Sequence, residues 1–133
     1  MNHVIDASVV TKWFVDEDGS DRAASVRGGA SAPDLIFAEV GNALWKLRRK
    51  EGLSDAGFAA RIEALKGAPI EITPIADLLP AAARLAAELD HPIHDCFYLA
   101  LAMREGAAVV TADRRFHDAV ATRRYLKRHI RML

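Results

Sequence analysis

Residues 107–113 read Ala-Ala-Val-Val-Thr-Ala-Asp, an uninterrupted apolar run that reaches a single acidic residue. A short apolar run closed by a charged turn is typical of a strand that is buried on both faces of a parallel sheet. Residues 3–6 read His-Val-Ile-Asp and repeat this pattern on a smaller scale. In open parallel sheets, ligands bind outside the carboxyl ends of the strands. We therefore expect Asp6 and Asp113 to lie at a ligand-binding edge.

The segments between these two runs have mostly helical patterns. The expected helices are apolar, alanine-rich or amphipathic, and they cover residues 8–15, about 34–49, 54–66, 76–89 and 95–103. Ser54 is the expected cap of the third helix. Residues 70–73 alternate as a strand, residues 129–133 are a candidate last strand, and residues 28–33 are expected to form a loop. Strands separated by helices favour a parallel α/β sheet sandwiched by helices.

Length and composition are those of one compact domain that spans residues 1–133. Of these residues, 51% are hydrophobic and 27% are charged, which is enough apolar material for a core. A single cysteine rules out an internal disulfide. The longest apolar run, residues 96–103, is far shorter than the roughly 20 residues that a membrane-spanning helix needs. A strand that begins at residue 3 leaves no room for a signal peptide, so we expect a cytoplasmic protein with no membrane segment.

Charge is balanced overall but unevenly distributed. The net charge of zero speaks against a general nucleic-acid coat protein. Residues 1–45 carry three basic and seven acidic side chains, whereas residues 114–131 carry seven basic side chains against Asp118 alone. A second basic cluster lies within residues 46–50. Such clusters bind phosphates, although a solvated face with cations near helix C-termini explains them equally well.

Four isolated carboxylates stand beside apolar runs. Each lies at the end of an expected strand or in or next to an expected helix: Asp6, Glu39, Asp95 and Asp113. An unpaired buried charge costs several kcal/mol, so such acids need a cation nearby. Glu39 shares helical spacing with Asn42 and Lys46, which places the three on one polar stripe.

A site made of three or four carboxylates offers only hard oxygen ligands. Such a site suits Mg²⁺ or Mn²⁺ better than zinc. A metal held there lowers the pKa of a bound water and neutralises charge on a phosphoryl oxygen, and this chemistry points to hydrolysis of a phosphodiester. Ser8 and Thr111, each two residues from an acid, could orient a carboxylate or a metal-bound water. The simpler alternatives are a helix cap for Ser8 and an ordinary strand position for Thr111.

Four segments together form a more specific signal. They read Asp-Ala-Ser at 6–8, Glu-Val-Gly-Asn-Ala-Leu at 39–44, His-Asp-Cys-Phe-Tyr-Leu-Ala-Leu-Ala at 94–102 and Thr-Ala-Asp-Arg-Arg-Phe at 111–116. Their order, and the separation of 18 positions between Asp95 and Asp113, resemble the PIN-domain ribonucleases and specifically the VapC-type toxins of bacterial toxin–antitoxin pairs. The resemblance extends over nearly the whole chain.

The resemblance implies a three-layer α/β/α sandwich with a central, mainly parallel sheet. It implies that the four acids hold Mg²⁺ or Mn²⁺ and are the catalytic residues, with Ser8, Asn42 and Thr111 around them. It further implies endonucleolytic cleavage of RNA, a homodimer, and inhibition by a cognate antitoxin whose C-terminal segment covers the active-site groove. Cys96 departs from the pattern, because a small residue, usually alanine, is expected there, and this raises a question about local packing.

Other combinations of residues are weaker candidates for sites. His94, Asp95 and Cys96 are consecutive on an expected helix and therefore point in directions too different for a cysteine-protease arrangement. His91 and His94 lack a second pair of zinc ligands, so hydrogen-bonded or exposed histidines are expected. Asp118 is a candidate fifth site carboxylate or a surface residue that balances nearby arginines. Trp13 and Trp45 are expected in the core or at a dimer interface.

Three other functional classes need to be compared with this one. A metal-dependent phosphoacceptor signalling domain also uses acids and a threonine at strand ends, but it needs a strand-end lysine that is not found at a suitable place. A haloacid-type phosphatase needs a second aspartate where Ser8 stands. A catalytically silent PIN-like binding module is disfavoured, because four mutually repelling acids have no use without a cation.

Overall fold

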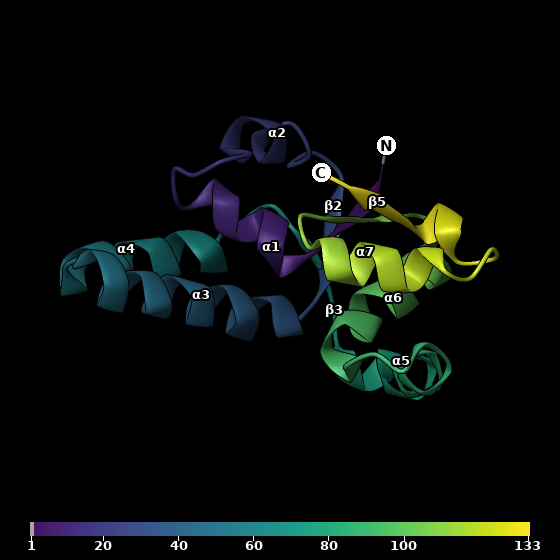
Figure 1. Ribbon diagram of the computed structural model, residues 1–133. Coiled ribbons are helices and arrows are strands. Elements are labelled where there is room, and N and C mark those ends of the chain that lie inside the picture. The colour runs from purple at the N-terminus through teal and green to yellow at the C-terminus, as the bar shows by residue number, and fades with distance from the viewer. Residues whose placement is uncertain (1) are drawn as a thin grey trace.

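The computed structural model describes residues 2–133 and contains a five-stranded parallel sheet between helices (Figure 1). The strand order is β3-β2-β1-β4-β5, and every neighbouring pair is parallel. The strands are β1 (His3–Ile5), β2 (Ala30–Pro33), β3 (Glu71–Thr73), β4 (Val109–Thr111) and β5 (Ile130–Met132). This architecture confirms the expected α/β class, including the last short strand.

The described residues contain seven α-helices. They are α1 (Ala7–Val10), α2 (Ser20–Ala24), α3 (Leu35–Glu51), α4 (Asp55–Lys66), α5 (Ile75–Leu89), α6 (Ile93–Glu105) and α7 (Arg114–Ala121). Two 3₁₀ turns, Thr11–Trp13 and Lys127–His129, complete the regular structure. The predicted cap of α4 is confirmed, because Ser54 Oγ accepts a hydrogen bond of 3.0 Å from the Gly57 amide.

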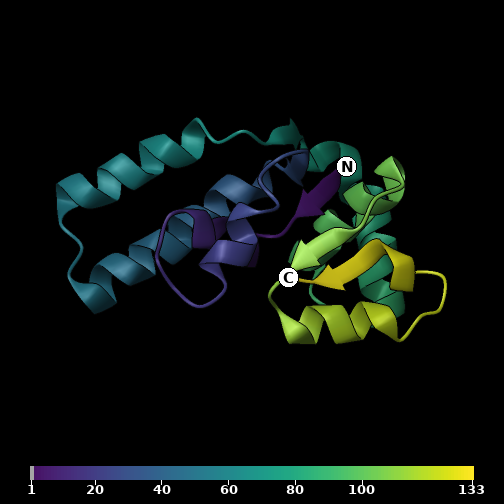
Figure 2. The ribbon, with the colours of Figure 1, turned by 90° about the horizontal axis from the view of Figure 1, so that it is seen from above.

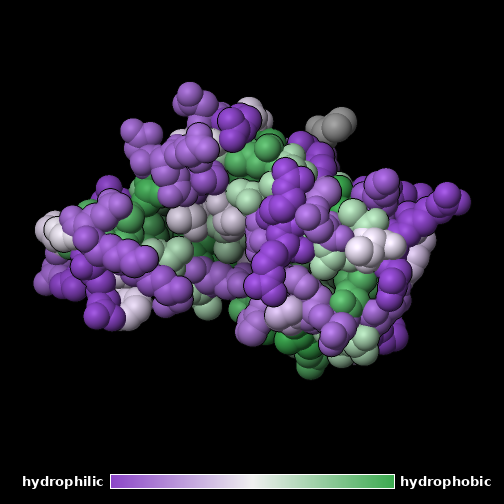
Figure 3. Space-filling view, in the orientation of Figure 1, coloured by the Kyte–Doolittle hydropathy of each residue, from purple (hydrophilic) through white to green (hydrophobic). Residues whose placement is uncertain are grey.

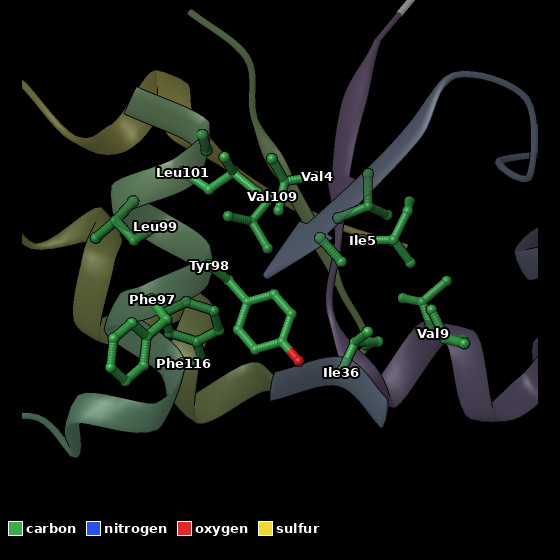
Figure 4. Close-up of a cluster of buried hydrophobic side chains, with 14 of the residues drawn as sticks. Val4, Ile5, Val9, Ile36, Phe97, Tyr98, Leu99, Leu101, Val109 and Phe116 are labelled. Carbon is green, nitrogen blue, oxygen red and sulfur yellow. The ribbon is translucent and has the colours of Figure 1, made fainter. Parts of the chain in front are cut away.

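The central strand β1 shows how the three layers meet. Figure 4 shows Val4 directed towards α6 and Ile5 directed towards α1 and Val9 on the other side. Both strand residues are completely buried, as expected for a strand in the middle of a parallel sheet. Helix α6 packs against the sheet and against α5, which explains why seven consecutive residues, 96–102, are buried.

The expected packing problem at Cys96 does not arise, because its side chain is completely buried in the core on α6. A thiol is small and behaves as an apolar group when it is buried. Tyr98 and Phe116 are the largest fully buried side chains of the protein (Figure 4).

The register of β1 and β4 determines where the site forms. Val4 pairs with Val109 and Ile5 with Val110, so the carboxyl ends of the two strands are adjacent. Figure 2 shows β1, β4 and β5 side by side and pointing in the same direction. Residues that follow β1 and β4, including Asp6 and Asp113, therefore leave the sheet at one edge, as predicted.

Helices α3 and α4 form a hairpin that extends away from the sheet (Figures 1 and 2). Gly52 ends α3 with a φ of +68°, a left-handed conformation that glycine adopts without steric cost. The first turns of α3 lie near the sheet, whereas its C-terminal half belongs to the extension.

Two local expectations are wrong. The loop expected at residues 28–33 contains β2, whose four residues are all buried between β1 and β3. Small residues have a low propensity for strands, and the pairing of β2 with a strand on each side outweighs this low propensity. The helix expected over residues 8–15 ends at Val10 and continues as a 3₁₀ turn, in which the Trp13 indole donates a hydrogen bond of 2.8 Å to the Ala23 carbonyl of the unpredicted helix α2.

Among residues 2–133, no helix combines the length and the apolar character required to cross a membrane.

Candidate active site

Asp6 lies directly after β1, and only 5% of its surface is exposed. Its Oδ1 accepts a hydrogen bond of 2.8 Å from the Ala7 amide and thereby caps α1. Its Oδ2 accepts hydrogen bonds from two hydroxyls, Ser8 Oγ at 2.8 Å and Thr111 Oγ1 at 2.6 Å. These three hydrogen bonds engage both carboxylate oxygens and fix the orientation of this buried acid.

The same two hydroxyls join the ends of β1 and β4. Ser8 Oγ accepts a hydrogen bond of 3.0 Å from the Ala112 amide, and Thr111 Oγ1 accepts one of 3.0 Å from the Asp113 amide. Both residues therefore belong to the surroundings of Asp6. The simple capping role for Ser8 is wrong, since Asp6 itself is the cap of α1.

Burial raises the pKa of the Asp6 carboxyl, because a charge is poorly solvated in the protein interior. The hydrogen bonds from Thr111 and Ser8 lower this pKa, whereas the negative charge of Asp95 raises it further. The net result is a carboxyl with a raised pKa that lies close to a second acid.

Glu39 lies on α3 and is half-buried. Its Oε1 accepts a hydrogen bond of 2.5 Å from the hydroxyl of Tyr98 on α6. Burial raises the pKa of Glu39, the Tyr98 hydrogen bond lowers it, and the charges of Asp6 and Asp95 raise it again. The negative charges of Asp6, at the end of β1, and of Asp95, on α6, thus both act on Glu39.

Asp95 lies in the first turn of α6, where the helix N-terminus favours a negative charge. Its Oδ2 lies 2.7 Å from Nε2 of His91, and the imidazole ring of His91 is stacked on Phe116 with 5.6 Å between centroids. The histidine is therefore held between the core and the acid, which agrees with the expectation of a hydrogen-bonded histidine.

Glu39, Asn42 and Asp95 line one cleft between α3 and α6, with a volume of about 540 Å³. Leu35, Ala38, Pro92 and His94 complete its wall. Two residues of the polar stripe predicted on α3, Glu39 and Asn42, therefore face this cleft, whereas the third, Lys46, lines a separate hollow. The cleft is large enough for a small polar ligand or for part of a polymer chain.

Asp113 is exposed and caps α7. Its Oδ1 accepts hydrogen bonds from the Arg115 and Phe116 amides at 3.0 and 3.4 Å, and the residue does not line the cleft. Its amide donates a hydrogen bond to Thr111 Oγ1, which in turn donates one to Asp6 Oδ2. Asp118 is also exposed, and its Oδ1 lies 2.9 Å from His117. The charges of Asp6 and Asp95 act on Glu39, which groups these three acids, but only Glu39 and Asp95 line the cleft, whereas Asp6 is buried outside its wall and Asp113 is exposed.

The donor chemistry of this group suits a hard divalent cation, since all three acids offer carboxylate oxygens. No lysine or arginine pairs with any of the four predicted acids within the described part of the chain. No three carboxylate, imidazole or thiol side chains among residues 2–133 are close enough to enclose one ion. The ligand types therefore fit a metal, although the side chains are not closed around a single point.

Sequence reasoning missed two residues that hold the acids in place. Tyr98 is 59 positions from Glu39, and nothing local marks the pair. His91 precedes Asp95 by four positions, a spacing at which side chains can meet, so a sequence signal existed for this contact.

Comparisons with known proteins identify the family and agree with the fold. The PIN domain family matches residues 3–121. The chain is 31% identical over 123 residues to Ribonuclease VapC3 of Pyrobaculum aerophilum, a match that covers 89% of this chain and 94% of that protein. The fold is similar to the crystal structure of PAE2754 from Pyrobaculum aerophilum, with a TM-score of 0.66, 24% identity and coverage of 90% of this chain and 79% of the other.

Proposed function

Because the chain belongs to the PIN domain family, we propose that it is a metal-dependent endoribonuclease that acts as the toxin of a toxin–antitoxin pair. The observation that carries the proposal is the setting of three acids: Asp6 is buried beneath two hydroxyls, Glu39 and Asp95 line one cleft, and no lysine or arginine among the described residues pairs with any of them. Acids arranged in this way favour the binding of a divalent cation. The relative named Ribonuclease VapC3 supports the type of reaction.

Asp6, Glu39, Asp95 and Asp113 are the residues that would hold Mg²⁺ or Mn²⁺. When bound, the metal would lower the pKa of a water molecule and offset the negative charge that develops on a phosphodiester. Asp113 belongs to this set by the family resemblance and by its connection to Asp6 through Thr111.

The roles of the protein groups follow from their hydrogen bonds. Ser8 and Thr111 orient Asp6, Tyr98 orients Glu39, and His91 orients Asp95. Because these hydrogen bonds orient the acids before a ligand binds, the acids lose little conformational freedom on binding. Hydrogen bonds of this kind adjust the properties of an acidic site. Asn42 offers an amide to the same cleft and is placed to contact the substrate.

RNA is the substrate that we propose, and basic side chains flank the cleft along α3. Two of the predicted phosphate-binding arginines already have acidic partners. Arg48 pairs with Asp55, and Arg123 contacts both the carbonyl and the carboxylate of Glu88. We therefore expect Lys46, Arg49 and Lys50, which share one hollow on α3, to contribute more to RNA binding than Arg48 or Arg123.

Three further proposals follow from the family resemblance. A cognate antitoxin binds the chain and blocks its cleft, the protein forms a homodimer, and it acts in the cytoplasm. Co-expression with the protein encoded by an adjacent gene, followed by light scattering of the purified complex and of the free chain, tests the first two. Elution of the free chain at monomer mass would contradict the homodimer.

The decisive experiment is incubation of the purified chain with labelled RNA in Mg²⁺, Mn²⁺ or EDTA, beside Asp6→Asn and Asp95→Asn. We expect metal-dependent cleavage that both substitutions abolish. Asp77→Asn is the matched control, because Asp77 is an exposed acid in the first turn of α5, as Asp95 is in the first turn of α6.

Cleavage that persists in EDTA, or that survives Asp95→Asn, would overturn the assignment. Binding of RNA without cleavage in any metal, by a protein whose folding is verified by circular dichroism, would favour the silent binding module. Acquisition of a phosphoryl group from a small phosphodonor would instead favour the phosphoacceptor domain.

A further inference from the structure

The face of α3 that lines the cleft continues along the helix as an aromatic and basic surface. Glu39 and Asn42 line the cleft. Trp45 lies three positions after Asn42, and Lys46 lies seven positions after Glu39. A second hollow of about 470 Å³ lies here, lined by Trp45, Lys46, Arg49 and Lys50. No acid lines this hollow, which therefore has the charge that a phosphate chain requires.

Trp45 is placed to meet a ligand. Its side chain is 42% exposed, and the guanidinium of Arg49 lies 5.2 Å from the centre of its ring system. Trp13 is a useful contrast, because it also lies under an arginine but is tied to α2 by its indole N–H and packs against the core. Trp13 thus has an obvious structural role, whereas Trp45 stands at the surface of the α3–α4 extension.

The other side chains that line the hollow beside Trp45 are those of Lys46, Arg49 and Lys50, all of them basic. In Figure 3, the part of the α3–α4 extension that faces the viewer is mostly hydrophilic. A single exposed aromatic ring among cations differs from an apolar patch of the kind that docks another folded protein. Aromatic rings combined with basic side chains are the usual means of binding single-stranded nucleic acid.

The spacing along the helix relates this surface to the reactive end of the cleft. With a rise of about 1.5 Å per residue, Trp45 lies about 9 Å from Glu39 along α3, and Arg49 lies about 15 Å from it. Roughly one or two nucleotides of an extended single strand cover the first distance. A strand with its reacting phosphate at the acids would therefore bring a neighbouring base to Trp45.

We propose that Trp45 is a stacking platform for an unpaired base of the RNA, and that Lys46, Arg49 and Lys50 bind the phosphates beside that base. The inference rests on the proposed ribonuclease function and specifies its substrate as a single-stranded segment or loop. Stacking tolerates any base, so the platform selects unpaired RNA over duplex and fixes the distance between the stacked base and the cut.

The test measures binding separately from cleavage. An unstructured, labelled RNA oligonucleotide is titrated into the Asp95→Asn protein, alone and combined with Trp45→Ala or Trp45→Phe. Fluorescence anisotropy reports affinity, and quenching of tryptophan fluorescence reports stacking. Phe37→Ala is the matched control, because Phe37 is a similarly exposed aromatic residue of α3 that lines neither hollow.

We expect Trp45→Ala to weaken binding of the single strand about tenfold or more, and Trp45→Phe to restore most of it. Phe37→Ala should have no effect, and a duplex of the same sequence should bind weakly to all variants. Affinity for RNA falls as the salt concentration rises. Lys46→Ala and Arg49→Ala should each make the slope of log affinity against log salt less steep by about 0.7, whereas Trp45→Ala should leave that slope unchanged.

Equal affinity and unchanged fluorescence in Trp45→Ala would overturn the inference. If the parent still cleaved RNA in that case, the proposed function would stand without it. If Trp45→Ala bound RNA normally but no longer captured the antitoxin, the surface would be assigned to the protein partner. Failure of the parent to bind or cut any RNA would overturn both proposals.

Discussion

The hydroxyl of Tyr98 donates a hydrogen bond of 2.5 Å to Oε1 of Glu39, and this bond joins the buried core to the cleft. The ring of Tyr98 is completely buried on α6, and its oxygen points towards α3 near Ile36 (Figure 4). Burial and the charge of Glu39 raise the pKa of Tyr98, so the phenol stays protonated and remains a donor at physiological pH. The same residue therefore contributes to the stability of the core and to the position of a site carboxylate.

Tyr98→Phe should separate these two contributions. The ring still fills the core, so we expect a loss of about 1 kcal/mol in the free energy of unfolding from the missing hydrogen bond. Glu39 would be free to move, and the cleavage rate should fall about tenfold, as expected for a misplaced site group. Urea denaturation and single-turnover cleavage measure the two effects.

Tyr125→Phe is the control for that substitution, because Tyr125 also donates to a glutamate, Glu88, but is exposed and away from the cleft. It should leave the cleavage rate unchanged. An unchanged rate in Tyr98→Phe as well would confine Tyr98 to the core.

Thr111→Val should destabilise the protein and disturb Asp6. The substitution keeps the shape of a fully buried side chain but removes the hydroxyl that donates to Asp6 and accepts from the Asp113 amide. The substitution leaves the Asp113 amide unsatisfied and removes one donor from the Asp6 carboxylate. The free energy of unfolding, measured by urea denaturation, should therefore fall by about 1–3 kcal/mol. Thr122→Val is the control, since that hydroxyl is exposed and bonds only locally to Ala119. Equal stability of both variants would contradict the role of Thr111.

The stability of the metal-free protein should decrease as the pH rises from acid towards neutrality. The pKa values of Asp6 and Glu39 are raised above 3.8 and 4.5, the values of the unperturbed groups. Between the unfolded and the raised folded pKa, the folded state binds more protons, so the free energy of unfolding falls with increasing pH. Denaturation in EDTA from pH 4 to pH 8 measures this slope.

Asp6→Asn should make the free energy of unfolding depend less on pH, because it removes the buried charge that causes most of the destabilisation. At pH 7 in EDTA the variant should be more stable than the parent, and the difference should vanish at pH 4. A parent whose stability rises steadily over this range would disprove the raised pKa values.

Mg²⁺ or Mn²⁺ should raise the melting temperature of the parent protein. An ion that binds only the folded state stabilises it according to its concentration and affinity. Asp6→Asn and Asp95→Asn should reduce the shift, whereas Asp77→Asn on α5 should keep it. This thermal measurement needs no substrate, and an equal shift in all four proteins would place the metal elsewhere.

Cys96 should be unreactive until the protein unfolds. Burial raises the pKa of its thiol to about 11, and its side chain has no exposed surface. At pH 8 about one thiol in a thousand is then a thiolate, against roughly a quarter in the unfolded chain. Labelling with a disulfide reagent should therefore follow the urea unfolding curve. Rapid labelling of the native protein would show that α6 opens locally.

Residues close together in the sequence allowed much of the fold to be predicted. The apolar runs that end at Asp6 and Asp113 predicted two parallel strands with acids at one edge, and Ser54 predicted the start of α4. The strand β2 escaped prediction, because its small residues have no strand pattern and owe their conformation to pairing with β1 and β3.

The sequence by itself determined which carboxylates stand beside apolar runs, because hydrophobic periodicity and strand ends are local properties. Only the tertiary structure decided how those acids are held. It joined Tyr98 to Glu39 and enclosed Asp6 between two hydroxyls 103 positions apart. The first contact arises where α6 meets α3 and the second where β4 pairs with β1, and contacts between distant segments leave no periodic trace in the chain.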